Sequence, residues 1–91
     1  MHWEEFTIKE GESVSDMITR FNNIINELVM LEVRYDQEQQ MRKILYSMTN
    51  EWNEVVKPII KSAKETLTIQ ELTGKLLTYE MNKIYKRLMA A

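Results

Sequence analysis

Residues 12–31 read ESVSDMITRFNNIINELVML and carry the clearest periodic pattern in the chain. Ser13 stands directly before the apolar residues and Asp16 follows three positions later, a pairing typical of a helix N-cap. Gly11 precedes them and tolerates the positive φ of a tight turn. We therefore predict a turn and then an amphipathic helix over about 14–31, because its apolar residues recur at spacings of three and four. They are Val14, Met17, Ile18, Phe21, Ile24, Ile25, Leu28 and Leu31.

Two shorter helices are expected after the first. Asp36 and Gln39 have the spacing of a capping box, which predicts the start of a helix over about 37–48. Another apolar pattern covers about 51–61. Within it, Pro58 removes a backbone donor and should kink or end the helix at the preceding residue.

The last expected helix is the longest and covers about 69–89. Thr68 and Glu71 form a capping box at its start. Gly74 lies inside the helix and costs about 1 kcal/mol relative to alanine, so we expect another backbone to approach closely there. The apolar stripe of this helix consists of Ile69, Leu72, Leu76, Tyr79 or Met81, Ile84 and Leu88.

Composition agrees with a small all-α domain. The 91 residues include two glycines, one proline and no cysteine, and 44% of them are hydrophobic. These values suit one core without disulfides or thiolate metal sites. We predict a single domain over 1–91, a compact bundle of about four helices preceded by an extended arm and turn over 1–12. A domain of this size buries only about 60 to 65% of its unfolded surface, so contact with another chain should help its stability.

The residues offer little for catalysis. His2 is the single histidine, cysteine is absent, and the chain has no phosphate-binding glycine loop and no HExxH sequence. We expect no enzyme activity, no cofactor, no metal ion and no small-molecule substrate. Neither a signal peptide nor a run of roughly 20 apolar residues that could cross a bilayer is visible, so we expect no membrane contact and a cytoplasmic location.

Charge is distributed unevenly around a net value of −2. Residues 1–54 carry 11 acidic and 5 basic side chains, whereas residues 55–91 carry 3 acidic and 7 basic ones. This polarity favours oriented contacts between copies, and the basic half also permits weak contact with RNA phosphates. An uneven solvated surface without a partner is the simplest alternative. The candidate RNA contacts on the last helix are Lys75, Lys83, Lys86 and Arg87.

Three blocks of sequence resemble a known family. KEGESVSDMITRF at 9–21 resembles the major homology region, which opens the C-terminal capsid domain of retroviral and retrotransposon Gag proteins. LYSMTNEWNEVV at 45–56 and TIQELTGKLLTYE at 68–80 are similar to later segments of the Gag polypeptide of copia-type LTR retrotransposons. The resemblance covers nearly the whole chain and implies a four-helix capsid domain that self-associates into a shell around element RNA.

The resemblance also implies roles for particular residues. In the homology region, Glu12 and Arg20 would form a buried polar pair that ties the turn at Gly11 to the first helix. The retroviral form has a glutamine before the glycine, whereas this chain has Glu10, so one hydrogen bond of the network must differ. The implied network consists of Gly11, Glu12, Ser13, Arg20 and Phe21.

The surface of self-association stays open at this point. Retroviral capsid dimers join through the second helix with an aromatic residue and a methionine, but this chain offers Arg42 and Lys43 there. Exchange of the first segment between subunits, as in related mammalian domains, also stays open because nothing in the sequence anchors the arm at Trp3 and Phe6. Our candidate self-association residues are Tyr46, Trp52, Leu77, Tyr85 and Met89.

The leading hypothesis is a non-enzymatic self-association module of a retrotransposon Gag capsid, or of a host protein derived from one. Its partner would be a second copy of the chain, in a homodimer or a higher oligomer, and it would contribute to particle assembly. One alternative is an RNA-binding or RNA-chaperoning module that uses the basic last helix. The other is a helical adaptor for a host protein.

Overall fold

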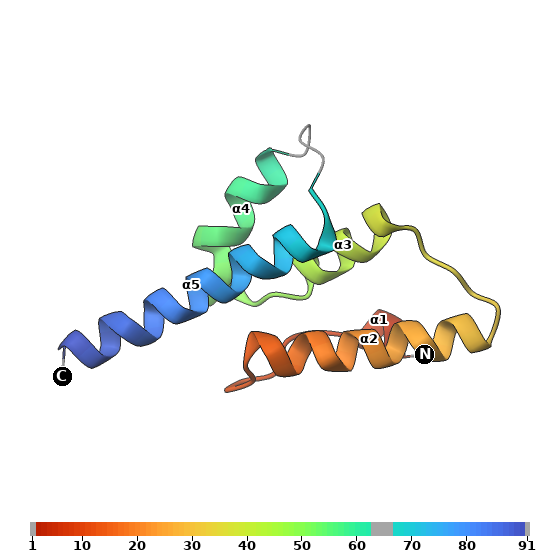
Figure 1. Cartoon of the computed structure of the whole chain (residues 1–91), viewed down its shortest axis with the longest axis horizontal. Coiled ribbons are helices and arrows are strands. Elements are labelled where there is room, and N and C mark those ends of the chain that lie inside the picture. The colour runs from red at the N-terminus through yellow and green to blue at the C-terminus, as the bar shows by residue number, and fades with distance from the viewer. Residues whose placement is uncertain (1, 63–66, 91) are drawn as a thin grey trace.

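The computed structural model describes residues 2–62 and 67–90. These residues form five α-helices and one 3₁₀ helix, and no strand occurs among them (Figure 1). The all-α prediction is confirmed. The elements are α1 (His2–Glu5), α2 (Val14–Met30), α3 (Gln37–Tyr46), η1 (Asn50–Trp52), α4 (Asn53–Lys61) and α5 (Ile69–Ala90).

The predicted caps are present at three helix starts. The Ser13 hydroxyl accepts a backbone N–H from the first turn of α2 at 3.1 Å. At α3 and α5 each capping box is closed in both directions, by Asp36 with Gln39 and by Thr68 with Glu71. Such caps satisfy N–H groups that the helix leaves unpaired, and each contributes about 1 kcal/mol.

The core is built from one face of each long helix. Phe21 of α2 is its largest fully buried side chain, and the expected face of α2 points inward except at its end, where Leu31 caps the helix and is exposed. Removing this apolar surface from water is the main contribution to stability. The fully buried side chains are Val14, Met17, Phe21, Ile44, Leu72 and Leu76.

The segment before α2 differs from its prediction. We expected an extended, unanchored arm, but α1 forms one helical turn and the next residues enter the core. Phe6 and Ile8 are buried, and the Ile8 N–H donates to the Ser47 carbonyl at 2.9 Å. Trp3 stacks on Tyr35 with ring centroids 4.2 Å apart. These apolar side chains find partners that are distant in sequence, so the arm is anchored within its own chain.

α4 ends at Lys61, the expected end of this helix, and passes through Pro58 without stopping there; a kink at Pro58 stays a prediction. Because Pro58 is exposed, solvent can hydrogen-bond to the Glu54 carbonyl that lacks the proline N–H. The close backbone approach that we expected at Gly74 is wrong. No atom outside its own helix backbone lies within 4 Å of the position that a Cβ would occupy there.

α5 differs most from the sequence pattern. The expected apolar stripe does not face the core along the whole helix, because only Leu72 and Leu76 of α5 are fully buried. Met81, Ile84 and Leu88 are exposed, because the second half of α5 extends beyond α3 and α4 (Figure 1). This extension explains a radius of gyration of 14.0 Å, compared with about 12 Å for a compact domain of this length.

Candidate functional site

A bidentate ion pair connects the turn before α2 to α2 itself. Nε and Nη2 of Arg20 donate to the two carboxylate oxygens of Glu12 at 2.6 and 2.7 Å, the strongest geometry for this type of pair. Nη2 also donates to the Thr7 carbonyl at 2.8 Å. The Lys9 N–H donates to Glu12 at 2.9 Å. The two charged groups therefore hold backbone on both sides of the turn.

We expected a buried pair, but the ion pair is only partly buried. The Glu12 side chain is 10% exposed and that of Arg20 is 31% exposed. The Arg20 guanidinium lies 4.8 Å from the centre of the Phe6 ring, which packs edge-on against Phe21. The hydrogen bonds from Arg20 lower the pKa of the Glu12 carboxyl from its ordinary value of 4.5, although burial opposes this shift. The same bonds raise the pKa of Arg20.

Gly11 forms the turn that brings Glu12 to this position. Its φ is +75°, a conformation that costs other residues roughly 1 to 2 kcal/mol. The Glu12 N–H donates to the Lys9 carbonyl at 3.0 Å and closes the turn. The structure thus places Gly11 in the turn, Ser13 at the cap of α2, and Phe21 in the core beneath the ion pair.

Glu80 of α5 binds the start of α2, two residues after Glu12, and was missed by sequence reasoning. Its carboxylate accepts the backbone N–H of Val14, the first residue of α2, at 2.8 Å. A carboxylate is favoured at this end of a helix because of the helix dipole and the unpaired N–H groups. The two residues lie 66 positions apart, so no local motif marks the contact.

A second feature is a row of exposed apolar side chains that runs from the middle of α5 towards its end, which we call the α5 stripe: Leu77, Met81, Ile84 and Leu88. Their exposed fractions run from 36% at Leu77 to 71% at Leu88. Leu77 directly follows the buried Leu76, and Ile84 directly follows Lys83, which contacts Glu51. One residue turns the helix by about 100°. The stripe is therefore a face separate from the one that packs against the body.

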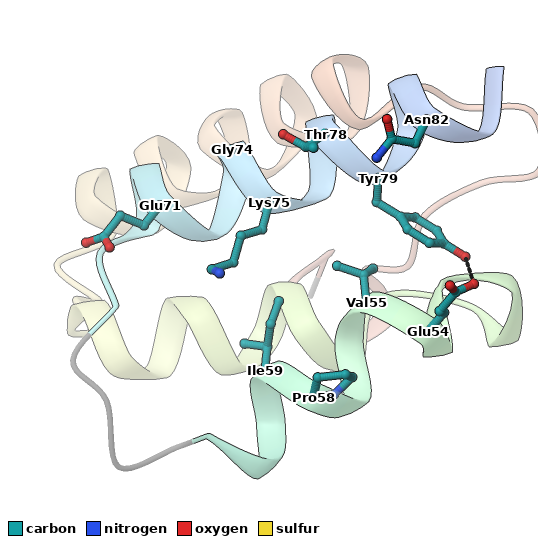
Figure 2. A pocket seen from close by; sticks show the side chains of 10 residues that line it. All are labelled: Glu54, Val55, Pro58, Ile59, Glu71, Gly74, Lys75, Thr78, Tyr79 and Asn82. Atoms are coloured by element: carbon teal, nitrogen blue, oxygen red, sulfur yellow. Dashed lines mark hydrogen bonds between the residues drawn. The ribbon is translucent and has the colours of Figure 1, made fainter. Parts of the chain in front are cut away.

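An open groove lies between α4 and α5, with a volume of about 660 Å³. Figure 2 shows Val55, Pro58 and Ile59 on the α4 side, and Lys75 and Tyr79 on the α5 side. The groove lies on the opposite flank of α5 from the stripe, since its residues Glu71 and Lys75 precede the buried Leu72 and Leu76 by one position. Within residues 2–62 and 67–90, no cluster of three His, Asp or Glu side chains could hold a metal ion.

A protein-family profile described as the gag-polypeptide of LTR copia-type matches residues 2–87. The chain belongs to this copia-type Gag family. The Gag polypeptide is a structural component and not an enzyme. Neither the curated proteins nor the solved structures that were searched contained a match. In the described parts of this Gag chain, no helix has the length and apolar character needed to span a membrane.

The candidate self-association residues of this Gag chain fall into different environments. Trp52 is buried in the core at 7% exposure and its ring lies against Tyr79, so its assignment to a surface contact is wrong. Its large indole ring fills space between η1 and α5. Leu77, Tyr85 and Met89 are exposed on α5, and Tyr46 is exposed at the end of α3. Leu77, Tyr85 and Met89 are therefore the candidates that share one exposed helix.

The candidate RNA contacts are likewise unequal. Nζ of Lys83 donates to the Glu51 carbonyl at 3.1 Å and lies 5.1 Å from the centre of the Tyr79 ring. This lysine is therefore held within the chain by a hydrogen bond and a cation–π contact. Lys75, Lys86 and Arg87 are exposed, and Lys75 points into the groove (Figure 2).

Replacing Arg20 by alanine should leave a largely buried Glu12 carboxylate without its partner. We expect the free energy of unfolding in urea to fall by about 2 kcal/mol, and Arg20→Lys to recover only part of this because lysine lacks the planar fork. Arg42→Ala is the matched control, since its pair with Glu38 is exposed and should contribute less than about 0.5 kcal/mol. Equal effects of Arg20→Ala and Arg42→Ala would contradict this role.

The Glu12 pair should also make stability depend on acid pH. Because the folded pKa of Glu12 lies below its ordinary value of 4.5, its contribution is present above about pH 4.5 and is lost as the pH falls through the folded pKa. Unfolding free energies measured over an acid pH series should therefore decrease more for the wild type than for Glu12→Gln. Identical pH dependences would show that Glu12 is not the group responsible.

Proposed function

We propose that this Gag domain self-associates through the α5 stripe and thereby contributes to particle assembly. The observation that carries the proposal is the exposure of four apolar side chains in a row on a helix that extends beyond α3 and α4. A contiguous exposed apolar surface is typical of an interaction site. Membership of the copia-type Gag family supports a structural role for this surface.

The stripe is suited to a protein partner because its neighbours on α5 are also apolar. Tyr85 and Met89 follow Ile84 and Leu88 by one position and are more than half exposed. Aromatic and methionine side chains are enriched at protein interfaces, and methionine adapts to irregular surfaces. Covering this surface with a second copy would bury apolar area that a small domain cannot bury alone.

A charge placed on the stripe should prevent association without unfolding the domain. For Met81→Glu we expect at least about tenfold weaker self-association, since burying an unpaired carboxylate costs well over 1.4 kcal/mol. Sedimentation equilibrium from micromolar to millimolar concentration would measure it. Asn23→Glu is the matched control, because it introduces the same charge at an exposed position on α2, outside α5.

The proposal requires three results together. The wild-type mass should rise with concentration, and Asn23→Glu should follow the wild type. Met81→Glu should associate at least about tenfold more weakly and keep the melting temperature of the dilute, monomeric wild type. A wild type that is monomeric at millimolar concentration would refute self-association by this domain. Equal association of Met81→Glu and the wild type would place the contact elsewhere.

A further inference from the structure

We propose that two copies of this domain pair their α5 stripes in antiparallel orientation about a two-fold axis. This inference rests on the proposed function and adds the orientation and register of the contact. The register places Leu77 opposite Leu88 of the second copy, and Met81 opposite Ile84 of the second copy. Each copy carries both residues of each pairing, so every contact occurs twice. The surface is therefore self-complementary, as a two-fold interface requires.

The spacing of the stripe fits direct helix pairing. Its residues follow each other at intervals of four, three and four, the pattern of a coiled-coil seam. From Leu77 to Leu88 the seam is about 16 Å long at a rise of 1.5 Å per residue. A seam of this length supports a modest affinity, which suits a contact that forms at high local concentration.

The position of the body on α5 leaves the seam accessible to a second copy. α5 contacts the rest of the domain as far along as Glu80 and Lys83, but it does so on another face than the stripe. The bodies of two paired copies therefore lie on the outer sides of the seam.

The distribution of charge favours the antiparallel orientation. Lys86 and Arg87 are exposed near the Leu88 end, whereas the acidic start of α2, with exposed Asp16, lies beside Glu80 because Glu80 binds the first N–H of α2. Antiparallel pairing brings the basic end of each copy level with the acidic region of the other. Parallel pairing would bring the two basic ends together. Complementary charges of this kind set the orientation of an interface.

Cysteine cross-linking tests the register directly, because the chain contains no cysteine. Leu77→Cys and Leu88→Cys chains, one of them isotopically labelled, would be oxidised alone and as a mixture. A disulfide requires Cβ atoms about 3.5 to 4.5 Å apart. We expect the mixed disulfide to exceed either homodimer several-fold, because identical positions lie about 16 Å apart along the antiparallel seam.

The outcomes separate this inference from the proposed function. Efficient homodimers of each single variant would show parallel pairing and overturn the orientation alone. Absence of every cross-link while both variants still self-associate would overturn the register. A wild type that does not self-associate in sedimentation would refute the proposed function itself.

A second measurement covers the case in which the leucine substitutions abolish association. Ala90→Cys lies outside the stripe and can carry a nitroxide label while the seam stays intact. Mixed with an isotopically labelled wild-type chain, it should broaden the amide signals of residues near Leu77 in the antiparallel pair. Broadening confined to residues near Leu88 would show the parallel pair and overturn the inference.

Discussion

The Glu12 carboxylate lies between the two donors of Arg20 and the N–H of Lys9, and the start of α2 is built around it. Because Arg20 also binds the Thr7 carbonyl, the pair fixes the path of the chain on which Phe6 and Ile8 enter the core. The first turn of α2 in turn binds Glu80. This bond connects α5 to the start of α2, and the burial of Leu72 and Leu76 holds α5 against the core.

Once α5 is fixed in this way, its three flanks have different environments. The inward face carries Leu72 and Leu76 into the core, one flank borders the groove beside α4, and the other flank presents the α5 stripe. The 22-residue helix extends beyond α3 and α4 (Figure 1), so it carries an apolar face without a partner among the residues that the structure describes. A small domain with little buried surface gains stability by covering such a face.

Local rules predicted the helices well. Ser13, Asp36 and Thr68 mark helix starts because a cap depends on residues only three positions away. Apart from the helical turn of α1, the failures concern contacts between distant segments. Neither the bond from Ile8 to Ser47 nor that from Val14 to Glu80 has a local signature. Periodicity also identified an apolar face on α5, but it could not show where the body ends and exposure begins.

The central claim is that the core and the α5 stripe are independent faces, one fixed by the fold and the other available to a second copy. Methyl NMR spectra recorded over a dilution series test this most directly. We expect concentration-dependent shifts at Leu77, Met81, Ile84 and Leu88, with no change at the buried Met17, Ile44 and Leu72. Shifts at the buried methyl groups, or no shift at the stripe up to millimolar concentration, would contradict it.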